Sequence, residues 1–193
     1  MKNCLLCDSK LKLTASWQQI IHGEKTKSIC TNCRELFEKS QMPNSLYRYN
    51  EAMKKYLHQL KFLQDCRLTI VFAKELQQAI KRYEVDIIMP IPMHVKRLRQ
   101  RTFAHVDELL KSANLPFEHL LEKTTTERQS DKNKQQRLQM ENLFRLKPTV
   151  EIAGKRILIV DDLWTTGTTI QHATKILQQA QVKSVHYLTL IKG

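Results

Sequence analysis

Apolar residues along the chain follow helical spacing in some segments and form short runs in others. Residues 68–82 place Leu, Val, Phe, Ala and Ile three or four positions apart, which predicts an amphipathic helix. The run VDIIMPIP at 85–92 is short, apolar and closed by prolines, which is typical of a buried strand entering a rigid turn. A second helix is expected over 103–113, and PFEHLLEKT at 116–124 can form another strand. Alternating strands and helices indicate an α/β domain.

The clearest pattern lies near the C-terminal end of the sequence. We expect a strand at 156–160, a helix at 168–180 and a strand at 184–191. Two strands joined by one helical crossover must be parallel, and the right-handed connection predicts a doubly wound layer. The expected fold class is therefore α/β, a parallel sheet flanked by helices. The long polar segment at 124–144 is interpreted as a mobile loop that leads into a short helix.

Composition and charge narrow the classes of function. The 193 residues are 41% hydrophobic, enough for one medium domain, with or without a small appendage. No apolar run approaches the roughly 20 residues that span a bilayer, and no signal pattern opens the chain, so the expected location is the cytoplasm. The formal charge of +13 favours polyanionic partners such as nucleic acid, phosphorylated metabolites or an acidic membrane surface.

Four cysteines predict a small metal-binding module at the N-terminus. Cys4, Cys7, Cys30 and Cys33 form two C-x2-C pairs, the spacing of a tetrahedral four-sulfur zinc site. Two disulfides are the weaker alternative in a reducing compartment. Such a short segment cannot build its own core, so the zinc would serve folding. We divide the chain into a zinc module at 1–40 and a main domain at 41–193. Cys66 stands alone, which is more typical of a small buried residue than of a nucleophile.

Residues 157–169 form the segment with the strongest chemical content. A hydrophobic run ends in Asp161 and Asp162, and a loop of four threonines around one glycine follows. A loop between a parallel strand and a helix binds anions, because free backbone N–H groups and the helix dipole point outward together. We therefore predict phosphate binding by Thr165, Thr166, Gly167, Thr168 and Thr169. The two aspartates are expected to accept hydrogen bonds from sugar hydroxyls or to hold a divalent cation through water.

A cluster of cations follows the strand expected at 85–92. Lys96, Arg97, Arg99 and Arg101 lie in a predicted loop, where open α/β sheets bind their ligands, although a solvated basic loop is the alternative. No convincing general base is visible. His94, His105 and His172 are candidates, yet a lone histidine is more often a packing or surface residue.

Residues 157–169 resemble the phosphoribosyl pyrophosphate motif of type I phosphoribosyltransferases: four hydrophobic residues, two acids, two variable residues and a T-T-G-x-T loop. The alternative is a phosphate loop of another α/β protein. Together with the cysteine pairs, nearly the whole chain resembles the ComF family. The resemblance also rests on Lys61-Phe62, PIPMH at 90–94, RLRQRTF at 97–103, and Gln129, Arg137 and Asn142. The family usually reads R-G-F-N where this chain has Arg101-Thr102-Phe103-Ala104.

The resemblance implies a type I phosphoribosyltransferase fold and a set of roles. The threonine loop would hold the 5′-phosphate of phosphoribosyl pyrophosphate, and Asp161 and Asp162, the candidate catalytic residues, would orient the ribose. Mg2+ would join the ribose hydroxyls to the diphosphate. Pyrophosphate would be bound by Arg97, Arg99 and Arg101, and a flexible loop carrying Gln129 and Arg137 would close over the site.

Family members are implicated in natural transformation and in handling incoming single-stranded DNA. Two classes of function therefore stay open. One is a competence protein that binds phosphoribosyl pyrophosphate and single-stranded DNA, with other competence proteins, such as a helicase or a DNA-processing protein, as partners. The other is an active phosphoribosyltransferase that transfers ribose 5-phosphate to a nitrogen acceptor and releases pyrophosphate.

Overall fold

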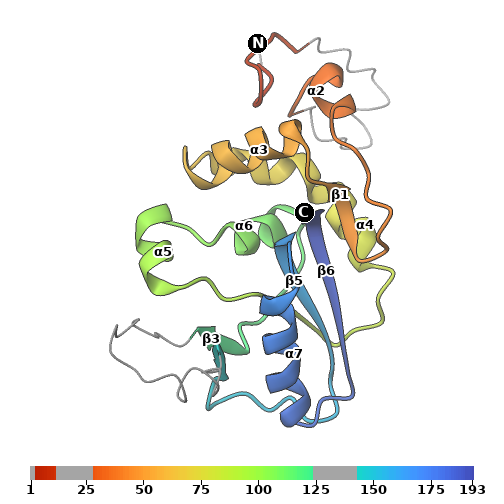
Figure 1. Ribbon diagram of the computed structural model, residues 1–193, viewed down its shortest axis with the longest axis vertical. Helices are drawn as coiled ribbons and strands as arrows, with labels where there is room; N and C mark the ends of the chain where they lie inside the picture. The colour runs from red at the N-terminus through yellow and green to blue at the C-terminus, as the bar shows by residue number, and fades with distance from the viewer. Residues whose placement is uncertain (1–2, 12–27, 124–142) are drawn as a thin grey trace.

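The computed structural model describes residues 3–11, 28–123 and 143–193 (Figure 1). A four-stranded parallel sheet forms the centre, in the order β1-β6-β5-β2, and a separate antiparallel pair joins β3 to β4. This arrangement confirms the predicted α/β fold. The helices and strands are α2 (Thr31–Glu35), β1 (Ser45–Arg48), α3 (Glu51–Lys61), η1 (Cys66–Phe72), α4 (Ala73–Ile80), β2 (Ile87–Pro90), α5 (Val95–Arg101), α6 (His105–Ser112), β3 (Leu121–Lys123), β4 (Phe144–Leu146), β5 (Arg156–Trp164), α7 (Thr168–Gln179) and β6 (Ser184–Lys192).

Strand β5 separates two hydrophobic cores, because successive side chains of a strand point to opposite faces. Leu158 and Val160 belong to the core beneath α3, α4 and α6. Ile157 and Ile159 belong to the core beneath α7 and the β3–β4 pair. All four side chains are buried, which explains why the strand reads as an unbroken apolar run rather than as an alternation.

The cysteine module rests on the first of these cores. Cys4, Leu6, Ile29 and Phe37 are buried in the same cluster as the side chains of α3 and α4. The Phe37 ring lies 4.9 Å from the Phe72 ring, centroid to centroid, in an edge-on arrangement. The module therefore adds apolar contacts to the main domain beyond its own cysteine cluster.

The predicted helix at 68–82 is wrong in its first half. Residues Cys66–Phe72 form the 3-10 helix η1, and a regular helix begins only at Ala73. Thr69, Ile70, Val71 and Phe72 lose side-chain freedom in an α-helix, since three are β-branched and one is aromatic. The Thr69 hydroxyl also donates to the backbone carbonyl of Cys66 at 2.7 Å, which favours the tighter turn.

The predicted strand at 156–160 is too short. Strand β5 continues to Trp164, so Asp161 and Asp162 lie within it. The reason is pairing with β6, which extends to the partners Leu163 and Ile191 and then Trp164 and Lys192.

No helix of the described residues is long and apolar enough to cross a membrane.

Candidate functional site

A cavity of about 150 Å³ opens at the carboxyl ends of β2 and β5. Parallel strands bring these ends to the same edge of the sheet, where open α/β folds bind ligands. Residues from five segments line the cavity: Lys61, Ile91, Pro92, Met93, His94, Arg97, Arg101, Ala104, His105, Val106, Asp107, Lys123, Asp161, Asp162 and Thr169. The lining is rich in ionisable groups, which indicates a polar, multiply charged ligand.

The two adjacent aspartates have different surroundings. Asp161 follows Ile157 and Ile159 in the strand alternation, and it is half-buried beside the cavity. Asp162 follows Leu158 and Val160 and points to the opposite face, where its side chain is 9% exposed. There Asp162 Oδ2 pairs with the Lys61 ammonium, and Asp162 Oδ1 lies 3.0 Å from His105 Nε2.

These surroundings drive the two carboxyl pKa values apart. Burial, reinforced by the negative charge of Asp162, raises the pKa of Asp161 well above its ordinary value. Burial alone would also raise the pKa of Asp162, but the hydrogen bond from His105 and the charge of Lys61 hold it below its ordinary value. Asp162 is therefore a carboxylate fixed by two partners, whereas Asp161 holds its proton more readily, and a cation beside it would favour its ionised form.

The threonine loop joins β5 to α7. Gly167 is the N-cap of α7 with φ 78°, a left-handed conformation that favours glycine. Thr165, Thr166 and Thr168 are exposed, and the hydroxyls of Thr166 and Thr168 are hydrogen-bonded at 2.9 Å. Thr169 alone of the five predicted loop residues lines the cavity. The loop thus borders the cavity through Thr169, while its other three threonines are exposed.

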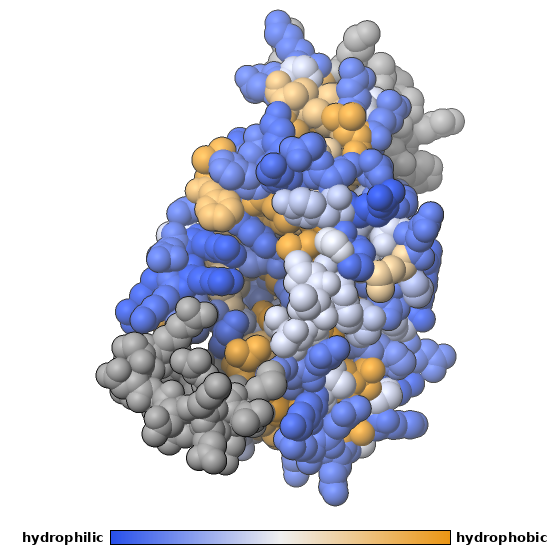
Figure 2. Space-filling view, in the orientation of Figure 1, coloured by the Kyte–Doolittle hydropathy of each residue, from blue (hydrophilic) through white to orange (hydrophobic). Residues whose placement is uncertain are grey.

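The predicted basic loop is a helix. Residues Val95–Arg101 form α5, which begins where His94 Nδ1 accepts a hydrogen bond from the Lys96 backbone N–H at 3.1 Å. This cap makes a helix of a segment that reads as a charge run. Arg97 and Arg101 line the cavity, whereas Arg99 is exposed and lies outside its lining. Figure 2 shows that hydrophilic side chains dominate this side of the molecule around α5.

The cavity contains two cations that the motif analysis missed. Lys61 ends α3, and Lys123 ends β3. Burial lowers the pKa of Lys123, and the nearby Arg97 lowers it further. Only the segment Lys61-Phe62 gave any signal in the sequence, and nothing in the spacing connects Lys123 with the motif. The predicted loop residues Gln129 and Arg137 lie outside the described residues.

The three candidate histidines are placed differently. His105 is buried beside Asp162, and its Nδ1 has no hydrogen-bond partner among the described residues. His94 lines the cavity and caps α5. His172 is half-buried on α7, outside the cavity lining. The structure therefore singles out His105, which sequence reasoning ranked no higher than the others.

The four module cysteines converge as their spacing predicts. Their sulfur atoms all lie within 4.8 Å of one another, so together they can hold a metal ion. The Cys30 backbone N–H donates to Cys4 Sγ at 3.3 Å, and the Cys33 N–H donates to Cys30 Sγ at 3.4 Å. Hydrogen bonding with Ser9 lowers the pKa of Cys7 to about 6. The pKa of Cys30 is also lowered, mainly by the Cys33 N–H, whereas burial raises the pKa of Cys33.

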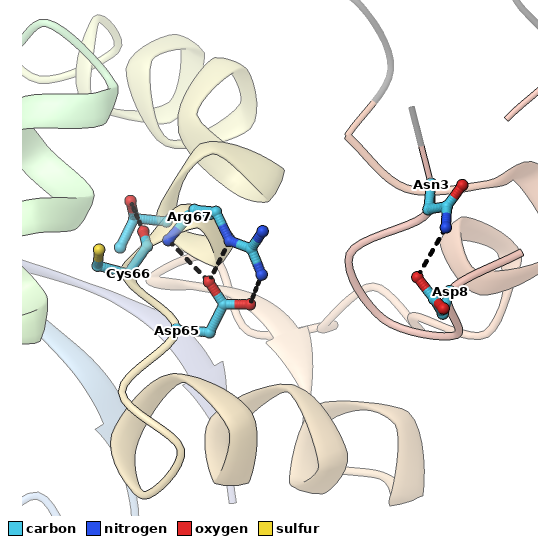
Figure 3. A network of polar contacts seen from close by, with 6 residues as sticks. Asn3, Asp8, Asp65, Cys66 and Arg67 are labelled. Atoms are coloured by element: carbon cyan, nitrogen blue, oxygen red, sulfur yellow. Dashed lines mark hydrogen bonds and ion pairs between the residues drawn. The ribbon is translucent and has the colours of Figure 1, made fainter. Parts of the chain in front are cut away.

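A second hollow, of about 1040 Å³, is lined by residues of the cysteine module and by residues of α3, η1 and α6. Figure 3 shows polar pairs on its two sides: Asn3 bonded to Asp8, and Arg67 held by both carboxylate oxygens of Asp65. Cys66 lies next to Arg67 and is exposed, so the expectation of a buried side chain is wrong. The reason is its place at the first position of η1, before the buried face of that helix begins.

Comparison with known proteins supports one family. The phosphoribosyl transferase domain family matches residues 56–193. Competence protein ComFC of Streptococcus pneumoniae (strain ATCC BAA-255 / R6) is 30% identical, over 98% of this chain and 99% of that protein. The chain belongs to the ComFC family. The ComFC protein of Bacillus subtilis (strain 168) is 26% identical, over 98% of this chain and 95% of its own.

One solved structure is similar to part of the chain. A hypoxanthine phosphoribosyltransferase from Staphylococcus aureus is 19% identical, with a TM-score of 0.41 over 64% of this chain and 62% of that one. Thr102 occupies the position at which the sequence resemblance leads us to expect glycine. It ends α5 with φ 63°, a conformation that glycine adopts without strain. Its hydroxyl donates to Gln64 Oε1 at 3.2 Å, a contact that glycine cannot make.

Proposed function

We propose that this protein is a competence protein that binds phosphoribosyl pyrophosphate together with Mg2+. The observation that carries the proposal is the composition of one cavity, which combines the Asp161 carboxyl group with the cations Arg97 and Arg101 and with Thr169. A ligand with a sugar between two phosphate groups needs acceptors for its hydroxyls and donors at both ends. The membership of the ComFC family supports the role in competence.

The roles follow from position in the site. We assign the 5′-phosphate to the loop Thr165–Thr169 at the N-terminus of α7, where backbone N–H groups and the helix dipole favour an anion. We assign the binding of the ribose hydroxyls to Asp161 and the binding of the diphosphate to Arg97 and Arg101. Mg2+ fits this donor set, because Asp161 is a half-buried carboxyl group and the ligand itself supplies further oxygens. When bound, the metal neutralises charge on the diphosphate.

We also propose zinc as the metal of the cysteine module, residues 1–40, and we assign ligand binding to residues 41–193. A tetrahedral zinc site with sulfur at about 2.3 Å places its sulfurs about 3.8 Å apart. Cys7 Sγ and Cys30 Sγ lie 3.7 Å apart, close to that value. With all four positions filled by cysteine, the zinc would be structural.

Titration calorimetry with phosphoribosyl pyrophosphate, with and without Mg2+, tests the ligand site. We expect Mg2+-dependent binding that Asp161→Asn abolishes. Arg97→Ala and Arg101→Ala should each weaken binding about tenfold or more, the effect of losing one charge-assisted hydrogen bond. Arg99→Ala is the matched control, since it removes the same charge from the same helix outside the cavity. Equal losses for Arg99→Ala and Arg97→Ala, or no heat from the unaltered protein, would contradict the proposal.

A second function, binding of single-stranded DNA, is favoured by an exposed patch at the end of α3. Phe62 is 67% exposed and Leu63 is 64% exposed. The Arg101 guanidinium lies 5.8 Å from the centre of the Phe62 ring, and His58 stacks on that ring. An exposed aromatic ring beside a cation is an arrangement on which an unpaired base can stack while a backbone phosphate is neutralised.

Fluorescence anisotropy with a labelled single-stranded oligothymidine tests this function. We expect Phe62→Ala to weaken binding by about 1–3 kcal/mol, the value of one base–aromatic stack. Binding should also weaken steeply as salt concentration rises, because phosphate contacts release counterions. Tyr49→Ala is the control, an aromatic residue that is 45% exposed outside the patch. If the Phe62 and Tyr49 variants bind alike, the patch is not the DNA site.

A further inference from the structure

The starting observation is that both oxygens of Asp162 are already engaged. Lys61 Nζ donates a hydrogen bond to Asp162 Oδ2, and His105 Nε2 is hydrogen-bonded to Asp162 Oδ1 at 3.0 Å. The side chains of Lys61, Asp162 and His105 are only 14%, 9% and 8% exposed. Each oxygen keeps a second lone pair, so it is the burial of Asp162 between its two partners, rather than a lack of acceptor sites, that restricts the access of a sugar hydroxyl. Asp162 is therefore poorly placed to bind a ligand directly.

Strand geometry makes this arrangement a fixed property of the site. Asp162 lies on the face of β5 that carries Leu158 and Val160, beneath α3 and α6. Lys61 is the last residue of α3, and His105 is the first residue of α6. Three elements thus bring their polar ends to one buried point. A buried carboxylate requires such compensation, because an unpaired charge there would be strongly destabilising.

Lys61, Asp162 and His105 all line the cavity, and of the three Lys61 carries the charge that attracts a phosphate group. An ammonium group has three N–H donors, and the bond to Asp162 uses one. Lys61 lines the same cavity as Arg97 and Arg101, the side chains assigned to the diphosphate. The bond to Asp162 removes the rotational freedom that a free lysine would lose on binding. The result is a cation held ready at the diphosphate end of the cavity.

We propose that Lys61 binds the diphosphate group of the ligand and that Asp162 is a positioning residue, which acts through Lys61 and does not touch the sugar. The inference rests on the proposed function, and it separates the roles of the two adjacent acids. Asp161 contacts the ribose, and Asp162 orients a cation. His105 holds the other oxygen of Asp162, and its buried Nδ1, which has no hydrogen-bond partner among the described residues, has bonding capacity left for the site.

Inorganic pyrophosphate with Mg2+ and ribose 5-phosphate, titrated separately by calorimetry, test the proposal. Lys61→Met and Asp162→Asn should each weaken pyrophosphate binding about tenfold or more, the loss of one charged hydrogen bond. Both variants should leave ribose 5-phosphate binding nearly unchanged. Lys61→Arg should retain most of the pyrophosphate affinity, which a general loss of structure would not allow. Asp162→Asn should add little in a Lys61→Met background, because both changes remove the same interaction.

The controls make each outcome decisive. Asp86→Asn removes a different ion-paired carboxylate, the partner of Arg156, and should leave pyrophosphate binding unchanged. If Asp162→Asn binds pyrophosphate normally but loses ribose 5-phosphate, the inference is overturned and the proposed function stands. If the unaltered protein binds neither phosphoribosyl pyrophosphate nor pyrophosphate, both are overturned. Should Asp162→Asn fail to fold by circular dichroism, the contrast between Lys61→Met and Lys61→Arg decides.

Discussion

Replacing Cys4 and Cys30 together by serine is expected to destabilise the whole chain. Structural zinc contributes an apparent 10–16 kcal/mol in small zinc-finger peptides, as much as the roughly 5–15 kcal/mol that stabilises a whole domain. Cys4, Leu6, Ile29 and Phe37 belong to the same core as α3 and α4, so loss of the proposed zinc would also withdraw apolar contacts from the main domain. We expect the thermal unfolding midpoint, followed by circular dichroism, to fall in the double variant and equally in the unaltered protein after chelation.

Cys66→Ser is the control for this experiment. Cys66 is exposed and lies outside the cluster, so its replacement should change the free energy of unfolding by no more than about 0.5 kcal/mol. A thiol reagent offers an independent measurement on the unaltered protein. One of the five cysteines, Cys66, should react at once, and the others should react only after chelation. An unfolding midpoint that is indifferent to the chelator would contradict a structural metal.

Gly167→Ala is expected to lower the free energy of unfolding by about 2–4 kcal/mol, from left-handed strain and overpacking together. Gly167 has φ 78°, and a Cβ atom added to it would lie 2.5 Å from Cζ2 of Trp164. Trp164 cannot easily retreat, since its ring stacks on Tyr187 with centroids 4.7 Å apart. Because the Thr165–Thr169 loop is the proposed phosphate site, displacement of this loop in Gly167→Ala should also weaken the binding of phosphoribosyl pyrophosphate.

Gly154→Ala separates the two costs in a urea denaturation series. Gly154 has φ 71°, but nothing lies within 4 Å of an added Cβ, so only the backbone strain of about 1–2 kcal/mol remains. The double change of Gly167→Ala with Trp164→Leu should show a smaller coupled loss than the two single changes added together. Equal losses for the two glycine variants would mean that the Trp164 contact carries no cost.

Patterns confined to neighbouring residues predicted structure well. The apolar run Ile157–Val160 indicated a strand buried on both faces, and the paired C-x2-C spacing indicated a cluster that the structure brings together. Errors arose where a local pattern competes with distant contacts. Pairing with β6 carries β5 through two aspartates, and the His94 cap makes a helix of a basic run.

The environment of the two aspartates shows the limit most clearly. Lys61 and Asp162 are 101 residues apart, and no spacing rule connects them. The opposite orientation of the two aspartates could nevertheless be predicted from the sequence. Because alternate residues of β5 face different cores, adjacent aspartates that continue the strand must point to opposite faces. Giving Asp161 and Asp162 the same role is therefore reasonable only if the strand ends before them.

The position of β6 also determines when the central sheet can form during protein synthesis. In the central sheet, β6 lies between β1 and β5, and the Ser45–Thr189 contact joins residues 144 positions apart. At translation rates of about 5–20 residues per second, roughly 7–30 s pass between the synthesis of β1 and the synthesis of β6. During that interval the nascent chain exposes an unpaired strand edge. The central sheet can therefore close only after β6 has been synthesised.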